Sequence, residues 1–305
     1  MLSGKRNSQN KGPCIISRII YSSLKSINFS QRAFKQIIKY PKRNRGLISP
    51  ERINRKLKVE SRIIEGFKVL TVYKNKDSDK HIVMLHGGAY VAEAVKGHRY
   101  LIERFALSYP YKVSFIDYPL APENNALTTL RVVEKAYRDI INSYPNDTIL
   151  LFGDSAGGGL ALALLKELHK KGNIRMPLKT ALVSPWLDIS MSNTDINKYV
   201  DTDVVLNLKG LAECAKLYAD KLDLKDPVVS PLYGNLEGLP EIKIWVSGIE
   251  LFYPDCILLN NKLNSAEGSS SSISVKEKMI HDWVIMPIKE RDETISEVVD
   301  FYNSF

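Results

Sequence analysis

Short apolar runs alternate with helical patterns along most of the chain. Eight runs have the length and composition of strands, at 57–63, 67–73, 81–85, 112–116, 148–152, 179–183, 242–247 and 275–280. Helical patterns separate most of the later runs, for example at 126–143, 156–171 and 255–264. Strands that alternate with helices predict βαβ units, whereas the close spacing of the first runs predicts an antiparallel start. We therefore expect an α/β fold with a mostly parallel, eight-stranded sheet flanked by helices.

Other segments do not fit this alternation. Residues 14–40 carry apolar residues at helical spacing with Lys and Arg between them, which predicts one or two amphipathic helices ending before Pro41. Their apolar positions are Ile15, Ile16, Ile19, Ile20, Leu24, Ile27, Phe34, Ile37 and Ile38. Segment 188–238 is rich in Asp and Asn, is helical in parts, and interrupts the sheet as an insertion. Glycine and serine at 268–272 predict a flexible loop.

The most specific motif is a glycine-rich turn around Ser155. The sequence Gly153-Asp154-Ser155-Ala156-Gly157 follows a strand-like run and precedes a helical one. Glycines two residues before and two after the serine permit a sharp strand-to-helix turn, which presents the hydroxyl above the sheet edge. A glycine-rich loop that binds phosphate is the alternative. The strand before the motif and the helix after it favour Ser155 as a nucleophile.

A second glycine motif, His86-Gly87-Gly88-Ala89-Tyr90, follows the strand-like run at 81–85. Backbone N–H groups of glycines can approach an oxyanion closely. We therefore expect oxyanion donors from Gly87 and Gly88, with the N–H of Ala156 as the third. Alone, the motif is equally compatible with an ordinary turn between a strand and a helix. Its occurrence together with the serine turn favours the oxyanion interpretation, with His86 as a structural support of the loop.

A nucleophilic serine needs a base, which is usually a histidine held by a carboxylate. In sites built on such a turn, the acid and the histidine follow the serine in the chain. Of the five histidines, His281 follows Ser155 at a useful distance. Glu250 comes shortly after the strand-like run at 242–247 and is the favoured acid. Asp255, at the start of the next helical pattern, stays open as the alternative.

The basic charge of the chain is concentrated in its first fifth. Residues 1–62 contain sixteen Lys and Arg against two acidic residues, so the rest of this chain of net charge +9 is mildly acidic. Such an excess would suit contact with nucleic acid or with an anionic membrane. Interleaved aromatic residues and zinc or recognition-helix motifs are missing from this segment, so we expect no nucleic-acid binding.

Composition narrows the class of protein further. An apolar content of 44% and a charged content of 25% over 305 residues are typical of a globular chain. The sequence has no apolar run of about 18 residues that would span a membrane, and no signal-peptide stretch. Three distant cysteines predict a reducing compartment, so the cytoplasm is the expected location. Histidines and cysteines lack metal-ligand spacing, so we expect neither a metal nor a cofactor.

These motifs together resemble those of the hormone-sensitive lipase family of α/β-hydrolases. The resemblance covers roughly residues 57–305 and is specific through the combination of motifs. Besides the two glycine motifs, it includes 117–123 (DYPLAPE), 184–188 (SPWLD), 230–232 (SPL), 238–240 (GLP) and 281–283 (HDW). It implies an α/β-hydrolase fold and the hydrolysis of small-molecule esters with short-to-medium acyl chains.

The resemblance also carries roles to individual residues. It implies a catalytic triad of Ser155, an acid and His281, with the oxyanion hole at Gly87, Gly88 and Ala156. Bacterial members of the family place their acid two residues after the position of Gly248, where Glu250 stands. The chain departs from the family pattern at Lys278, where glycine is usual, and at Asn124-Asn125. These departures weaken any transfer of substrate preference.

A helical cap is the last implication of the resemblance. It would consist of the basic N-terminal segment, 1–56, and an insertion at about 188–230 within a catalytic domain, 57–305. We therefore expect the apolar stripe of residues 14–40 to cover the mouth of the site, with peripheral contact with an anionic membrane as the rival interpretation. A homo-oligomer stays open, as does a catalytically silent binding protein on the same scaffold.

Overall fold

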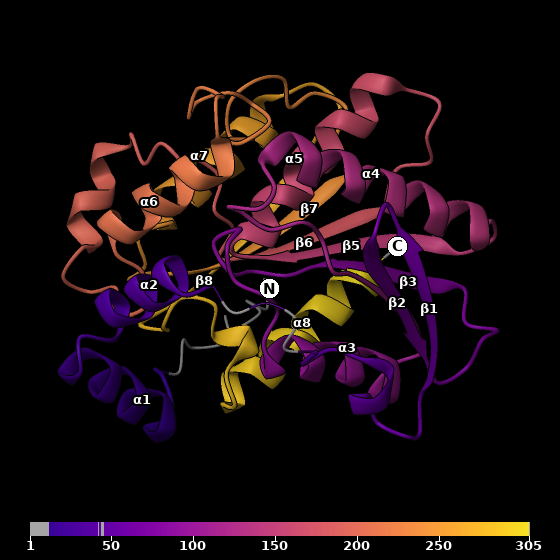
Figure 1. Cartoon of the computed structure of the whole chain (residues 1–305), viewed down its shortest axis with the longest axis horizontal. Helices are drawn as coiled ribbons and strands as arrows, with labels where there is room; N and C mark the ends of the chain where they lie inside the picture. The colour runs from indigo at the N-terminus through magenta and orange to yellow at the C-terminus, as the bar shows by residue number, and fades with distance from the viewer. Residues whose placement is uncertain (1–11, 42, 44–45, 305) are drawn as a thin grey trace, which may run out of the picture.

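One eight-stranded sheet forms the centre of the molecule (Figure 1). The computed structural model describes residues 12–41, 43 and 46–304. Residues 1–11, at the start of the expected N-terminal segment, lie outside the described residues. The strands are β1 (Lys58–Ile64), β2 (Phe67–Tyr73), β3 (Lys80–Leu85), β4 (Tyr111–Ile116), β5 (Thr148–Asp154), β6 (Lys179–Val183), β7 (Glu241–Ser247) and β8 (Ser271–Lys276).

The order of the strands across the sheet is β1-β2-β4-β3-β5-β6-β7-β8. β1 pairs with β2 and β2 with β4 in antiparallel fashion, and the remaining neighbours pair parallel. Parallel neighbours need crossover connections, which the intervening helices supply. The predicted fold, a mostly parallel eight-stranded sheet with an antiparallel start, is confirmed.

Helices cover both faces of the sheet (Figure 1). On one face lie α3 (Lys96–Ser108) and α8 (Lys289–Asn303), and their residues Phe105 and Val298 share one apolar cluster. On the other face lie α4 (Ala126–Ser143), α5 (Ala156–Lys171) and α7 (Tyr253–Ser265), whose residues Val133, Leu164 and Leu259 share the second cluster. α4 and α5 have the bounds that their apolar periodicity predicts, because each presents a continuous apolar stripe to the sheet.

The last strand of the sheet differs from the strand that the sequence predicts. β8 spans Ser271–Lys276, four residues earlier than the predicted run at 275–280, and it includes two serines of the predicted flexible loop at 268–272. It lies at the edge of the sheet, and all of its residues are at least partly exposed. A strand with so little buried surface carries few apolar residues, so its sequence signal is weak.

The helix of the insertion and the two helices of the N-terminal segment lie together at one end of the sheet (Figure 1). α1 (Ile15–Ser26) and α2 (Phe29–Lys39) lie within 14–40, where the sequence predicts one or two helices, and α6 (Leu208–Ala219) belongs to the insertion. α2 packs on α6, where the buried Phe34 ring lies against Gly210. Short 3-10 helices occur at η1 (Pro50–Arg52), η2 (Thr194–Tyr199) and η3 (Trp283–Ile285).

α1 docks on the body through polar contacts at its start and middle. The backbone N–H of Cys14 and the hydroxyl of Ser17 donate to the Glu290 carboxylate at 2.6 and 2.8 Å. The Tyr21 hydroxyl donates to the Thr202 carbonyl oxygen at 3.1 Å. α1 is therefore in contact with both the insertion and the start of α8.

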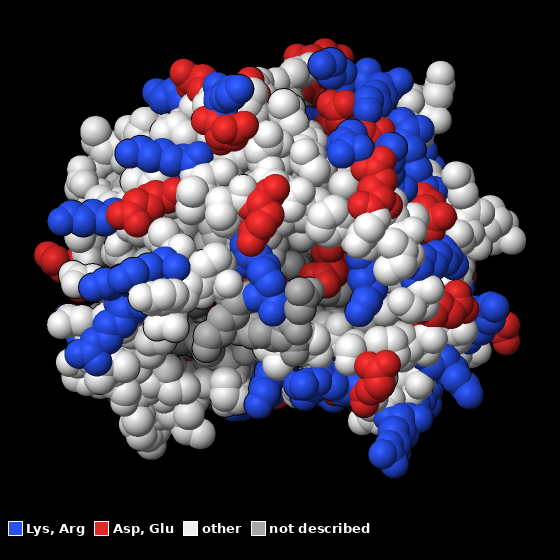
Figure 2. Space-filling view, in the orientation of Figure 1, with Lys and Arg blue, Asp and Glu red and all other residues white. Residues whose placement is uncertain are grey.

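Part of the predicted apolar stripe faces solvent. Ile15, Ile16, Ile19 and Ile27 are 74%, 57%, 58% and 45% exposed, so the expectation that the stripe covers the mouth of the site is wrong for these four side chains. In Figure 2 the lower left corner, where Figure 1 draws α1, is almost entirely white, and Lys and Arg gather above it. Within the described residues, every helix is too short or too polar to cross a membrane.

Candidate active site

Ser155 occupies a strained turn between β5 and α5. Its backbone has φ 49° and ψ −120°, a combination that most residues avoid. A Cβ on Gly157 would lie 2.2 Å from the Leu85 carbonyl oxygen, and one on Gly153 would lie 2.4 Å from the Gly157 carbonyl oxygen. Both positions therefore require glycine for the turn to close. The turn presents the Ser155 side chain at the carboxyl end of a central strand.

A chain of hydrogen bonds extends from Ser155 into the protein. His281 Nε2 lies 2.9 Å from Ser155 Oγ, and His281 Nδ1 lies 3.1 Å from Glu250 Oε2. The Ser184 hydroxyl also donates to Glu250 Oε2 at 2.9 Å. Ser155, His281 and Glu250 are 6%, 4% and 1% exposed. The structure thus brings together the three residues that the sequence analysis favours.

The surroundings of Glu250 act on its charge in opposite directions. Burial raises the pKa of the Glu250 carboxyl above its ordinary value, while the adjacent His281 and the hydrogen bonds to the carboxylate lower it in part. Phe252 packs its ring edge to face against His281, with ring centroids 5.2 Å apart. The carboxylate and the imidazole therefore interact in a site that excludes most water, where electrostatic interactions are strong.

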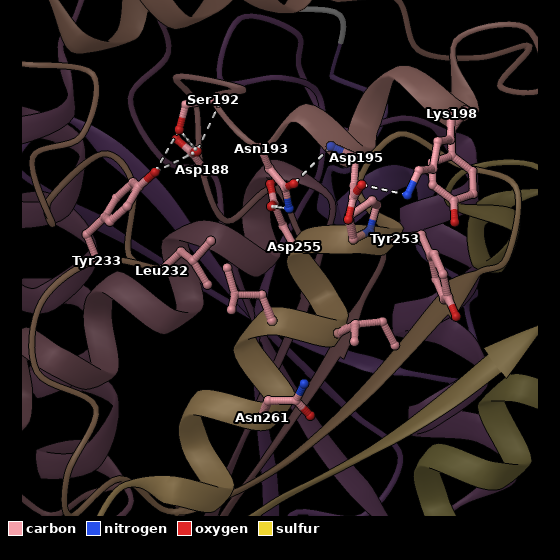
Figure 3. A pocket seen from close by; sticks show the side chains of 14 residues that line it. Asp188, Ser192, Asn193, Asp195, Lys198, Leu232, Tyr233, Tyr253, Asp255 and Asn261 are labelled. Carbon is pink, nitrogen blue, oxygen red and sulfur yellow. Dashed lines mark hydrogen bonds and ion pairs between the residues drawn. The ribbon is translucent and has the colours of Figure 1, made fainter.

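Asp255, the alternative acid, lies elsewhere. It occupies the first turn of α7 and accepts a hydrogen bond from Asn193 Nδ2 at 2.8 Å (Figure 3). Burial raises the pKa of Asp255 to about 6. Its side chain lines a cavity of about 590 Å³ between the insertion and α7, whose lining does not include Ser155, Glu250 or His281. The structure therefore pairs Glu250, and not Asp255, with the histidine.

In the second glycine motif, which follows β3, the structure contradicts one predicted oxyanion donor. The Gly87 N–H donates to Asp154 Oδ2 at 2.7 Å, so it is already engaged and cannot also bind an oxyanion in this structure. The assignment of Gly87 as an oxyanion donor is therefore wrong in this conformation. Gly88, at φ 131°, and Ala156, at the start of α5, stay candidates.

The family pattern of the alpha/beta hydrolase fold matches residues 82–285. The chain belongs to this family. Within the α/β-hydrolase fold, it is of the hormone-sensitive-lipase-like kind. An esterase from Acinetobacter venetianus is 31% identical over 189 residues, which are 61% of this chain and 62% of that esterase. The matched part thus spans less than two thirds of that relative.

Solved structures resemble a larger part of the hydrolase. A proposed esterase from Staphylococcus aureus is 27% identical with a TM-score of 0.81, covering 90% of this chain and 92% of that one. The protein EstE5, in a crystal soaked with p-nitrophenyl butyrate, is also 27% identical in sequence, with a TM-score of 0.77. The match covers 92% of this chain and 96% of EstE5. The fold therefore extends well beyond the residues of the family match.

Aromatic residues support residues 86–90, the loop that contains the second glycine motif and is called the glycine loop below. The His86 ring stacks on Tyr118 with centroids 4.3 Å apart, and the Tyr118 hydroxyl donates to the His86 carbonyl oxygen. The Tyr90 ring stacks on Tyr218 of α6 at 3.7 Å. His86 thus has the supporting position that the sequence predicts, and the insertion packs directly on the loop.

The insertion also holds the loop that carries Glu250. The Thr202 hydroxyl donates to the Ile249 carbonyl oxygen, and Asp203 Oδ2 accepts the Leu251 N–H, each at 2.9 Å. Sequence reasoning missed both residues, because nothing in the insertion marks them. Ser184, the second donor to Glu250, could have been identified from the sequence, because it is the first residue of the SPWLD motif.

Proposed function

We propose that this hydrolase cleaves carboxylic esters through Ser155, His281 and Glu250. The hydrogen-bonded chain from Ser155 Oγ through both ring nitrogens of His281 to Glu250 carries the proposal. Ser155 Oγ attacks the ester carbonyl carbon while His281 Nε2 takes its proton, and Glu250 stabilises the resulting imidazolium. The alcohol leaves with the proton from His281. Water, activated by the same histidine, then hydrolyses the acyl-enzyme.

The oxyanion of each tetrahedral intermediate would be bound by backbone N–H groups of Gly88 and Ala156. Ala156 opens α5, so its N–H is one of the helix N-terminal donors that lack an intrahelical acceptor. The positive end of the α5 dipole adds to this stabilisation. Removing one such donor typically costs about 10²–10³ in kcat, so the two groups account for a large part of the rate.

Esters with short-to-medium acyl chains are the proposed substrates. The name of the Acinetobacter relative supports ester hydrolysis, and the soak of EstE5 with p-nitrophenyl butyrate supports a short acyl chain. The test is a series of p-nitrophenyl esters from acetate to laurate, combined with labelling by a fluorophosphonate probe. We expect labelling at Ser155 and the highest kcat/KM on the shorter esters. Wild-type protein that neither reacts with the probe nor cleaves any ester would be the silent binding protein instead.

We further propose that α1 contacts an anionic membrane surface. Its exposed isoleucines, Ile15, Ile16 and Ile19, form an apolar face. Residues 1–50 contain eleven Lys and Arg and no acidic residue. An apolar helix face combined with basic side chains suits the interface of an anionic bilayer. α2 faces inward on α6, so the two N-terminal helices would have different tasks.

Co-sedimentation with lipid vesicles tests this contact. We expect binding to vesicles that contain phosphatidylglycerol, little binding to pure phosphatidylcholine, and loss of binding in a triple Ile→Ser variant at 15, 16 and 19. Ile63→Ser is the matched control, because Ile63 is 62% exposed on β1, away from α1. Equal sedimentation of the triple variant would refute the contact. A wild-type dimer in light scattering that the triple variant abolishes would assign the same face to self-association.

A cytoplasmic location remains our proposal for the chain. All three cysteines, Cys14, Cys214 and Cys256, are free thiols, and the last two are buried. Free thiols are usual in a reducing compartment. Fractionation of cells that express a tagged protein would test it, and recovery outside the cell would contradict it.

A further inference from the structure

Two buried carboxyl groups are sequence neighbours of the proposed catalytic residues. Asp154 directly precedes Ser155, and Asp282 directly follows His281. An oxygen of each carboxyl group lies within 4.8 Å of an oxygen of the other, and the two residues are only 0% and 5% exposed. Two ionised carboxylates in contact within a buried site repel each other strongly. One of the two must therefore hold a proton.

Asp154 is the carboxyl group that carries the charge. Its Oδ2 accepts the Gly87 N–H at 2.7 Å and lies 2.9 Å from His98 Nε2. His98 Nδ1 accepts the Val95 N–H at 2.8 Å, so the ring hydrogen must be on Nε2, which donates to Asp154. With two donors on Oδ2, Asp154 stays ionised. Burial and the neighbouring charge of Asp154 raise the pKa of Asp282 well above its ordinary value.

The remaining oxygens of the pair agree with this assignment. Oδ1 of Asp154 and Oδ1 of Asp282 are buried and have no donor among the described residues. A proton on Asp282 supplies a donor to Asp154. Ligand atoms of His98, Asp154 and Asp282 lie within 4.8 Å of one another, a spacing that a metal ion could also use. A metal would need the lone pair of His98 Nε2, but that nitrogen carries the donated hydrogen.

We propose that the proton shared by Asp282 and Asp154 positions His281 and the glycine loop relative to Ser155, an inference that rests on the proposed function of this site. Asp154 ends β5, and its carboxylate accepts the Gly87 N–H of the glycine loop and faces the carboxyl group of Asp282, which follows His281. One carboxylate thus links the three segments that must stay in register for acyl transfer. When hydroxide removes the proton as water, two charges face each other and this link is lost.

Other titratable groups surround the pair. His98 and Asp154 face each other from α3 and β5, while the charge of Glu250 further favours the proton on Asp282. Among the described residues, the titratable groups around the two carboxyl groups include His86, His98, Tyr118, Glu250 and His281. A substitution at Asp282 changes none of these residues chemically, so differences between variants and wild type report on the Asp282 side chain and its proton.

Two substitutions at Asp282 distinguish the effect of its titratable proton from the effect of its side chain as a hydrogen-bond donor. Asp282→Asn keeps an N–H donor toward Asp154 but cannot titrate, whereas Asp282→Ala removes the donor. We expect Asp282→Ala to lower kcat on p-nitrophenyl acetate about tenfold to a hundredfold with little change in KM, because His281 is displaced. Asp282→Asn should restore most of this loss and extend activity to higher pH. Asp77→Asn, at an exposed carboxylate, is the control.

Thermal unfolding gives a second measurement that does not depend on catalysis. Because the folded-state pKa of Asp282 is raised, the folded state binds more protons than the unfolded state, and wild-type stability falls as pH rises toward that pKa. Asp282→Asn avoids this loss. The difference in Tm between Asp282→Asn and wild type should therefore grow between about pH 5 and pH 8.

The outcomes distinguish this proposal from the proposed function. A Tm difference that does not change with pH, or a stoichiometric metal ion in the purified protein, would overturn the shared proton. Wild-type kcat in Asp282→Ala would overturn its positioning role. If no variant and no wild type cleaves esters, the proposed function fails, while the pH dependence of Tm still tests the proton itself.

Discussion

At the scale of single residues, the hydroxyl of Ser155 is the reactive group of the proposed mechanism, and its environment makes a simple substitution informative. Ser155→Ala removes the hydroxyl while keeping the Cβ that the turn already accommodates. We expect ester hydrolysis to fall to the residual level that binding and the oxyanion donors supply, typically about 10³–10⁴ above the reaction in water. The measurement is kcat on p-nitrophenyl butyrate with an unchanged Tm as the control for folding. Activity within tenfold of wild type would remove Ser155 from the mechanism.

Glu250 and Asp255 offer a matched pair of carboxylates. Glu250→Gln removes the charge that faces the imidazolium, and we expect kcat to fall by about three to four orders of magnitude. Asp255→Asn leaves the chain from Ser155 to Glu250 untouched, because its partner is Asn193. Its kcat should stay close to that of wild type. Steady-state kinetics of the two variants decides between the acids, and reversed effects would make Asp255 the catalytic carboxylate.

The residues of the candidate site were predictable to different degrees. The glycine spacing around Ser155 and the order of serine, acid and histidine identify the side chains, because the chemistry restricts residue types. The engagement of the Gly87 N–H by Asp154 was not predictable, because a motif shows which glycines are near a site but not what each N–H donates to. Side-chain contacts from distant segments decide such details.

At the scale of elements, apolar periodicity predicts α4 and α5 well, since both present long buried stripes to the sheet. It fails for β8, which lies at the sheet edge and begins with two serines. It also leaves open what an amphipathic helix packs against. α2 meets α6, whereas α1 keeps several isoleucines in solvent, and both helices have the same kind of sequence.

The contact between α2 and α6 depends on one small residue. A Cβ on Gly210 would lie 2.3 Å from Cγ of Phe34, so Gly210→Val forces the two helices apart. We expect a loss of about 1–3 kcal/mol in the free energy of unfolding, as is usual for overpacking. Lys209→Ala, an exposed neighbour on the same helix, is the control. Chemical denaturation measures the effect.

A double variant tests the cause. The loss from Gly210→Val should shrink in a Phe34→Ala background, because the ring that meets the new side chain is absent. Equal losses in both backgrounds would mean that the substitution acts on α6 alone, and the packing of α2 would not explain it.

For the protein as a whole, the pH dependence of stability is the sum of contributions from carboxyl groups whose pKa values are shifted in opposite directions. Burial raises the pKa of Asp255 to about 6, and burial together with the charge of Glu93 does the same for Asp117. Such groups bind more protons in the folded than in the unfolded state, so each contributes stability that declines as pH rises between about 4 and 6. The pKa values of other carboxyl groups, such as Glu134, are lowered, so the stability that they contribute is lost as pH falls.

Asp255→Asn isolates one of these contributions. Asparagine can still accept the hydrogen bond from Asn193 but needs no proton to be buried. We therefore expect the variant to be more stable than wild type at pH 7 and to lose this advantage near pH 4. Differential scanning calorimetry at both pH values measures it. An advantage of the same size at pH 4 would show that packing, and not ionisation, is responsible.

The contact of α1 with Glu290 has a consequence for the order in which the molecule is made. The Glu290 carboxylate, which accepts hydrogen bonds from Cys14 and Ser17, lies 276 and 273 residues after these donors in the chain. Synthesis begins at the N-terminus, so the residues of α1 leave the ribosome long before the carboxylate on which they dock has been made. During translation Cys14 and Ser17 have no Glu290 carboxylate to donate to, whereas α2, on which α1 also packs, follows directly in the chain. The contact between α1 and α8 can therefore close only when synthesis is nearly complete, so the start of α1 docks late in folding.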